Sequence, residues 1–516
     1  MPIASVATRK GSPCQQESGS EGEDRTTSAG PELPEDIWYH IHSLLPLRDA
    51  ARASRVCHAF LCSWKCHPNL TFSKSTMGLN SRRLTLNTKK SRIFIDRVDQ
   101  IMINHSGIGV KRFKLDYDGS YFDTSKLTSW LQIAVTPGIE ELEISVCLPR
   151  KQEHYNFPCS LLSAGSGGNS IQGLSLRCCA FRPMAGLGCL TRLHLSVVHI
   201  TGDELGCLLS SSFALEELDV KNCREIICLK IPCLLHRLSK LTVSVRNTPT
   251  VIENKAPNLC TVSISSDILH ISIGDSLKVK CLKIFCLDEF SLVHHARAKL
   301  PANMPNLETL RIYSVGEMIS TPCVPGKFLH LKHLDICLGS SRTPFAFSPD
   351  YDYFSLVFFL DACPILETFM LEVKQTRMKH DPVEDSSHLR QMPGHRHGNI
   401  KKVEIIGFCS AKSMVELARH ILENATSLEC LTLDTVLYDY ENYRCEEAYR
   451  LSDHKFGKCA WISKHMIKEA HKALLAIERY VVMKVPSTVK LNVMKPCSRC
   501  HVLKSRQSNV ISTTIV

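Results

Sequence analysis

The chain has 516 residues. This is too long for a single ordinary hydrophobic core, so the length favours several domains or an array of repeats. Hydrophobic residues make up 44% and charged residues 22%, a balance that excludes a mostly disordered chain. The 62 Lys and Arg exceed the 51 Asp and Glu by 11 without a long basic block, which favours a solvated basic surface over a nucleic-acid tract.

The sequence gives no sign of export or membrane insertion. It has no apolar window of about 18 residues, and its first thirty residues lack a basic segment followed by an apolar core. We therefore expect no membrane association and a location in the nucleus, the cytoplasm or both. The 25 cysteines are scattered beside aliphatic residues, which predicts buried thiols in a reducing compartment rather than a disulfide framework.

The first hundred residues divide into three segments. Residues 1–31 are rich in Ser, Gly, Glu and Thr, which predicts a disordered tail. Residues 32–72 form a small cluster of two or three helices, with an apolar stripe on the first and a break at Pro46 before Asp49 begins the next. Such a short cluster can hardly supply its own core, so its stripe is expected to pack against another surface. Residues 73–109 are expected to link this cluster to the rest of the chain or to cap the repeats.

The segment 110–437 contains an internal repeat. The pattern apolar-x-x-apolar-x-apolar occurs at 110–115, 139–144, 171–176, 190–195, 215–220, 238–243, 259–264, 279–284, 307–312, 331–336, 366–371, 400–405 and 428–433. From the middle residue of the first triplet, Phe113, to that of the last, Leu431, twelve steps cover 318 residues. The mean step of 26.5 residues lies within the roughly 20 to 29 of a leucine-rich repeat (LRR). We predict a solenoid in which parallel strands form a horseshoe.

The residue between the last two apolar positions of each triplet must point away from the core, because side chains alternate along a strand. These residues are predicted to line one concave surface. Their mixed charge suits a protein or peptide target rather than a phosphate track. The candidate target-binding residues are Glu143, His194, Asp219, Thr242, Lys283, Arg311, Asp335 and Glu404.

The last segment, 438–516, departs from the repeat. A helix is expected from Ile467 to Val482, either as a cap over the last repeat, the interpretation we favour, or as a partner-binding helix. Cys497, Cys500 and His501 supply too few ligands for structural zinc, as do Cys62, Cys66 and His67, so no metal or cofactor is expected. The sequence around His397 is polar, which predicts a solvated loop. No catalytic signature is present, so no catalytic residue is proposed.

Three regions resemble a known family. The stretch Leu33-Pro34-Glu35-Asp36-Ile37, followed by residues 41–57 and by Trp64, is similar to a plant F-box. Residues 399–437 resemble the FBD-like region of plant F-box/LRR proteins, and the Cys497 to His501 tail is similar to that of cereal members. The resemblance implies an α/β protein in which a helical F-box precedes an LRR solenoid with a helical C-terminal cap.

The family resemblance also implies a function. Such a protein is the substrate receptor of an SCF-type cullin-RING E3 ubiquitin ligase, in which the F-box binds a Skp-type adaptor, and through it cullin, while the repeats bind an unidentified protein. The residues implied to face or support the adaptor are Leu33, Pro34, Ile37, Ile41, Leu44, Leu45, Pro46, Leu47, Val56, Cys57 and Trp64. Two alternatives remain: a scaffold that does not use the adaptor, and, less favoured, a nucleic-acid-binding repeat protein.

Overall fold

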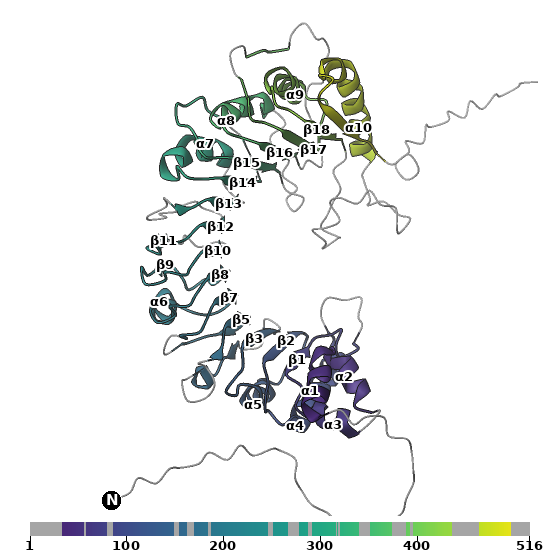
Figure 1. The fold of residues 1–516 in the computed structure, drawn as a ribbon, viewed down its shortest axis with the longest axis vertical. Helices are drawn as coiled ribbons and strands as arrows, with labels where there is room; N and C mark the ends of the chain where they lie inside the picture. Colours follow the sequence, from purple (N-terminus) through teal and green to yellow (C-terminus); the bar gives the residue numbers. More distant parts are fainter. Residues whose placement is uncertain are drawn as a thin grey trace, which may run out of the picture.

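The structure is a computed structural model. It describes residues 34–55, 58–79, 86–148, 154–162, 170–183, 187–245, 251–266, 278–286, 291–315, 317, 320–339, 351–373, 389–392, 396–435 and 464–496. The predicted tail, 1–31, and the Cys497 to His501 segment lie outside the described residues. Within the described ranges, fifteen strands form one sheet in which every neighbouring pair is parallel. The strands stack into an arc with helices along its outer side, so the predicted horseshoe is confirmed (Figure 1).

The spatial order of the strands in the sheet follows their order in the chain. Its strands are, in spatial order, β1 Asn69–Phe72, β2 Arg112–Asp118, β3 Glu141–Cys147, β5 Gly173–Arg177, β7 Arg192–Ser196, β8 Glu217–Lys221, β10 Lys240–Val245, β12 Thr261–Ser266, β13 Cys281–Cys286, β14 Thr309–Ser314, β15 His333–Leu338, β16 Thr368–Val373, β17 Lys402–Ile406, β18 Cys430–Asp434 and β19 Lys490–Met494. Two small parallel pairs lie outside this sheet: β4 Tyr155–Asn156 with β6 Cys179–Ala180, and β9 Cys228–Ile231 with β11 Val251–Asn254.

The repeated triplets account for the strands β2 to β18 of the main sheet. In all thirteen triplets the three apolar side chains are buried. Each strand also begins with the same backbone contact, in which one carbonyl accepts two amide hydrogens from the next repeat; the Lys111 carbonyl, for example, accepts from Glu140 at 2.8 Å and Glu141 at 3.0 Å. Burial and hydrogen bonding therefore repeat together and fix the register of neighbouring strands.

Helices occupy the outer side where the connections between strands are long enough. They are α4 Thr88–Asn104, α5 Thr124–Ala134, α6 Gly202–Ser210, α7 Leu292–Asn303, α8 Val357–Asp361, α9 Lys412–Asn424 and α10 Lys464–Ala476. Three further helices, α1 Glu35–Leu44, α2 Leu47–Ala53 and α3 His58–Lys65, precede β1 and lie at the N-terminal end of the sheet (Figure 1). Side-chain caps explain several starts: Asn87 accepts from the Lys90 amide before α4, and Thr201 with Glu204 forms a capping box at α6.

The sheet extends further than the triplets predict. β1 lies inside the segment expected to be helical, 32–72, and β19 lies inside the expected cap, 438–516. The pattern does not identify either strand because its first apolar position is taken by His67 before β1 and by Thr488 before β19. The sheet therefore runs from the N-terminal helices almost to the end of the described chain.

The C-terminal helix is confirmed, with a change in its ending. α10 continues through a π-helical turn, Ile477–Val481. Of the apolar face expected on this helix, Ile467, Ala470, Ile477 and Val481 are buried, whereas Leu474 is half-buried. This turn packs beside α9, while β19 adds a half-exposed strand at the end of the sheet (Figure 1). The helix therefore covers the outer side of the last repeats, and a strand rather than a helix ends the sheet.

Candidate protein-binding surfaces

The first candidate surface lies on the three N-terminal helices. α3 packs against both α1 and α2, and the following strand β1 contacts α2. Two prolines organise the cluster, because Pro34 and Pro46 are the N-cap residues of α1 and α2. The helices leave large apolar side chains in solvent: Leu44 is 72% exposed, and Ile37 and Leu61 are each 40% exposed.

The residues predicted to face the adaptor fall into three groups. Pro34, Ile37, Leu44 and Pro46 are exposed, Ile41, Leu45 and Trp64 are half-buried, and Leu47 is buried; Leu33, Val56 and Cys57 lie outside the described residues. Leu47 belongs to the continuous hydrophobic core, and Trp64 packs against it. These two side chains therefore hold the helices to the solenoid. Leu61 was not predicted, although its spacing on a short amphipathic helix could have identified it.

A pair of buried histidines joins the helical cluster to the solenoid. The His67 ring accepts a hydrogen bond from the Asn69 amide at 3.1 Å through Nδ1, so its other nitrogen, Nε2, carries the proton and donates to the Leu45 carbonyl at 3.2 Å. His105 repeats this arrangement: Nδ1 accepts from the Gly107 amide at 2.9 Å, and Nε2 donates to the His67 carbonyl at 3.0 Å. Both rings are therefore held in the neutral form.

This joint is expected to weaken in acid. Burial lowers the pKa of both His67 and His105 below the ordinary value of about 6.5. Because the pKa of each histidine is lower in the folded chain, the unfolded chain takes up a proton first as the pH falls. The contribution of the two neutral rings to folding stability is therefore complete above about pH 6.5, the pKa in the unfolded chain, and is lost as the pH falls from there to the pKa in the folded chain. We expect hydrogen exchange of α1 and α2 to accelerate between about pH 7.5 and 5.5, after correction for the intrinsic rate.

The matched variants of this experiment are His67→Gln and His236→Gln. The first should reduce the pH dependence, because Gln does not titrate and only His105 is then left in the joint to take up a proton. The second removes an exposed histidine and should leave the pH dependence as it is in the unmodified chain. Identical pH profiles for the unmodified chain and His67→Gln would show that protonation of His67 does not weaken the joint.

The second candidate surface is the concave face of the sheet. The register joins Thr71, Lys114, Glu143, Ser175, His194, Asp219, Thr242, Ser263, Lys283, Arg311, Asp335, Met370, Glu404, Thr432 and Asn492 into one row across all fifteen strands. All eight candidate target-binding residues lie in this row, which we call the concave row. Their neighbours along each strand are buried, so the alternation expected from the sequence is present.

Several charges in the concave row neutralise one another. Lys114 pairs with Glu143 at 2.7 Å and Arg311 with Asp335 at 3.5 Å. Asp219 is only 9% exposed; burial opposes its charge, but hydrogen bonds from His194 and Lys221 outweigh it and lower the pKa of the carboxyl group. Its Oδ2 takes both contacts, while Oδ1 has no hydrogen-bond partner among the described residues. Oδ1 is itself buried, so the charge of Asp219 faces its neighbours in the sheet rather than solvent.

A cationic and aromatic patch stands near the middle of the concave face. Lys283 and Arg311 are partners in the register of β13 and β14, and two residues further along the same strands Phe285 pairs with Tyr313, their rings 6.1 Å apart. Lys283 has no ionic partner within the described part of the chain. The patch thus offers the cation of Lys283 beside two half-buried rings. The sequence predicted Lys283 and Arg311 as target-binding residues but not the two aromatic residues.

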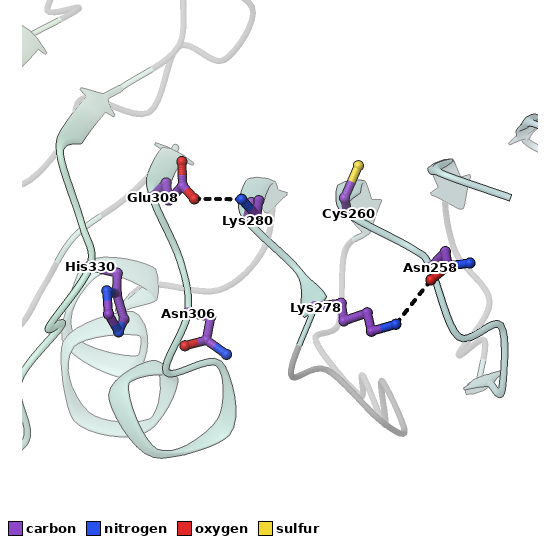
Figure 2. Close-up of a pocket in the computed structure, with 7 residues that line it drawn as sticks. All are labelled: Asn258, Cys260, Lys278, Lys280, Asn306, Glu308 and His330. Atoms are coloured by element: carbon purple, nitrogen blue, oxygen red, sulfur yellow. Dashed lines mark hydrogen bonds and ion pairs between the residues drawn. The ribbon is translucent and has the colours of Figure 1, made fainter. Parts of the chain in front are cut away.

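A polar hollow of about 410 Å³ lies at the starts of β12 to β15. Figure 2 shows its seven lining residues, Asn258, Cys260, Lys278, Lys280, Asn306, Glu308 and His330, on neighbouring turns. Lys278 donates to Asn258 at 3.0 Å and Lys280 pairs with Glu308 at 2.8 Å, so both cations already have partners. None of these residues was predicted. The hollow therefore lies along the edge of the sheet at which these four strands begin.

One sequence expectation about histidine was wrong. His397 does not lie in a solvated loop: it is 6% exposed, its amide donates to the Asn424 carbonyl at 3.0 Å, and its Nε2 lies 3.1 Å from that of His420. Polar neighbours in the sequence suggest solvent exposure, but the chain here packs against α9. Among the described residues no three metal-binding side chains are grouped to hold an ion, and no helix is long and apolar enough to cross a bilayer.

Comparison with models of known protein families shows which family the chain belongs to. A model named At1g61320/AtMIF1, LRR domain, matches residues 101–498, about three quarters of the chain, and a model of the F-box domain matches residues 31–71. The chain belongs to this LRR family and carries an N-terminal F-box. The resemblance drawn from the sequence is therefore confirmed, and the helical cluster α1 to α3 is the F-box of an F-box/LRR protein.

The F-box/LRR protein has similar proteins in Arabidopsis thaliana. FBD-associated F-box protein At5g53635 is 24% identical over 424 residues, which cover 78% of this chain and 94% of that protein. F-box/LRR-repeat protein At3g42770 is 22% identical over 359 residues, which cover 66% of this chain and 63% of that protein. The similarity to the first protein extends over most of both chains, so their architecture is shared.

Proposed function

We propose that this F-box/LRR protein is the non-catalytic, substrate-recognising subunit of an SCF-type cullin-RING E3 ubiquitin ligase. The observation that carries the proposal is the F-box itself, whose helices keep Ile37, Leu44 and Leu61 in solvent at one end of a long solenoid. Three large apolar side chains left in solvent on so small a helical cluster favour an interface with a partner. The Skp-type adaptor, and cullin through it, are the partners that an F-box implies.

The joint between the F-box and the solenoid supports this role. Backbone and histidine contacts tie the two together: the Ser106 amide donates to the Lys65 carbonyl at 2.8 Å, and the side-chain amide of Asn69 donates to the Ser43 carbonyl at 3.2 Å. Leu47 extends the solenoid core into the F-box. A target held on the repeats would therefore keep a fixed orientation relative to the adaptor.

The concave face is the proposed site for the target. Its row of residues includes Glu143, His194, Asp219, Thr242, Lys283, Arg311, Asp335 and Glu404, which offer both charges and hydrogen-bonding groups. Around Lys283, Phe285 and Tyr313 the chemistry favours a target segment with an acidic residue next to an apolar one, since a carboxylate can pair with Lys283 and apolar groups can pack on the rings. We place the complex in the nucleus, the cytoplasm or both.

The test is recovery of the complex from plant cells that express the full chain. We expect a Skp-type adaptor and cullin to copurify with it, and proteins captured by proximity labelling to accumulate when the proteasome is inhibited. An adaptor-independent scaffold would yield neither cullin nor accumulation. A nucleic-acid-binding protein would instead retain RNA or DNA with an affinity that falls steeply with salt. Either of these results would overturn the proposed function.

A further inference from the structure

Two thiols meet at the ends of neighbouring strands in the N-terminal half of the solenoid. Cys147 is the last residue of β3 and Cys178 directly follows β5, strands that lie side by side in the sheet (Figure 1). Their Sγ atoms are 3.1 Å apart, and both residues are half-buried rather than enclosed in the core. The remaining gap to a disulfide, whose bond length is about 2.05 Å, is on the order of 1 Å.

The repeat geometry holds Cys178 in place. Its φ is 57°, in the left-handed region that most side chains avoid, and the same position of the next two repeats has the same conformation, at Val197 (55°) and Asn222 (53°). The Cys178 amide donates to the Ser196 carbonyl at 3.1 Å. This turn directs the Cys178 thiol toward β3 as part of the fold, so the contact between the two sulfurs does not depend on an exposed loop.

The two thiols share a proton unequally. A hydrogen bond from the Cys178 thiol to the Cys147 sulfur, helped by the charge of Arg177, lowers the pKa of Cys147 to about 7 and raises the pKa of Cys178. Burial alone would raise the pKa of both, as it does for the enclosed Cys179 and Cys223. Cys147 is therefore the nucleophilic thiolate of the pair, and Cys178 is the adjacent thiol that can resolve an oxidised partner.

We propose that Cys147 and Cys178 form a redox-modification site, a reversible disulfide that links two neighbouring repeats when the chain meets hydrogen peroxide. The Cys147 thiolate attacks one peroxide oxygen and breaks the O–O bond, which gives a sulfenic acid and hydroxide. The Cys178 sulfur then attacks the Cys147 sulfur, the S–S bond forms, and the hydroxyl group leaves as water with the Cys178 proton. The hydroxide takes up the proton that Cys147 released on ionising, so overall two thiols and one peroxide yield one disulfide and two waters.

The site stands apart from the adaptor and target proposals but touches the same face. Cys147 extends the line of Glu143 and Ser145 along β3, and its register partner on β2 is Asp118. A disulfide here would close the chain between residues 147 and 178 and fix β3 against β5 at the border of the concave face. In a reducing compartment a disulfide of this kind is transient and serves as a sensor.

The test is differential alkylation of the folded full chain after graded exposure to hydrogen peroxide, with the modified peptides identified by mass spectrometry. We expect Cys147 and Cys178 to lose alkylation together, to appear in one linked peptide, and to regain alkylation after reduction with dithiothreitol. The rate should rise with pH around pH 7, because the thiolate is the reactive form. A circular dichroism spectrum that is unchanged by the treatment would show that the chain is still folded when it reacts.

Matched variants assign the roles of the two cysteines. Cys178→Ser should leave Cys147 as a sulfenic acid that dimedone traps, whereas Cys147→Ser should leave Cys178 alkylatable. Cys281→Ser removes another half-buried thiol, whose pKa burial raises, and should leave formation of the disulfide unchanged. Continued alkylation of both thiols in the unmodified chain, or a linked peptide that pairs Cys147 with a different cysteine, would overturn the proposal even if a variant fails to fold.

Discussion

Replacement of Leu44 by aspartate is expected to lower the affinity of the chain for a Skp-type adaptor by at least about 100-fold, or about 2.8 kcal/mol. Leu44 is 72% exposed at the C-terminal end of α1, so the free chain gains little from its side chain. Burial of a leucine in an interface contributes about 1.5 to 3 kcal/mol, and a carboxylate without a partner in the same place adds a desolvation cost. Both effects act on the complex rather than on the free protein.

Leu475→Asp is the matched control for this experiment. Leu475 lies on α10, at the opposite end of the solenoid, and is 65% exposed, so the substitution makes the same chemical change in similar surroundings (Figure 1). We expect adaptor binding by Leu475→Asp to match that of the unmodified chain, and both variants to keep its stability within about 0.5 kcal/mol. Titration calorimetry with purified adaptor measures the affinity; equal binding by both variants would exclude Leu44 from the interface.

The repeats were predictable because each one obeys a local rule. A buried strand needs apolar residues two apart, and the turn before it needs another three residues earlier, so a six-residue pattern carries both the strand and its orientation. The same rule placed Glu143, His194 and Arg311 on the concave face without any knowledge of the neighbouring strands. Where the rule fails, at His67 before β1 and Thr488 before β19, the sequence did not reveal the strand.

Contacts between repeats were beyond the sequence, because they depend on register. Cys147 and Cys178 are 31 positions apart, and only the alignment of β3 with β5 brings their sulfurs together. Burial of the His397 ring follows in the same way from packing against α9, and the hydrogen-bonded position of Asp219 depends on His194 of the preceding strand as well as on Lys221 of its own strand. Sequence periodicity thus predicts which way a side chain faces, but not what it meets there.

Gly407→Ala is expected to destabilise the C-terminal repeats by about 3 to 5 kcal/mol. Gly407 has a φ of +77°, which alone costs an L-residue about 1 to 2 kcal/mol. Cys178, Val197 and Asn222 adopt a positive φ at the equivalent position of other repeats despite this cost. At Gly407 an added Cβ would also lie 2.2 Å from the carbonyl oxygen of Val373, at the end of β16, so one backbone must move.

Two further glycines separate the strain at Gly407 from the steric overlap. Gly138 has a φ of +102° with open space around it, so Gly138→Ala should lose only about 1 to 2 kcal/mol. Gly206 lies within α6, where an added Cβ would meet nothing within 4 Å, and Gly206→Ala should stabilise its helix by about 0.5 to 1 kcal/mol. In a solenoid each repeat contacts only its neighbours, so a local change can unfold a few repeats without the rest. Hydrogen exchange of peptides from β16, β17 and α9 is therefore the measurement that isolates the effect of Gly407→Ala. If Gly407→Ala and Gly138→Ala cost the same, the close approach to Val373 would contribute nothing, and the packing of β16 against the turn after β17 would have to be looser than the geometry shows.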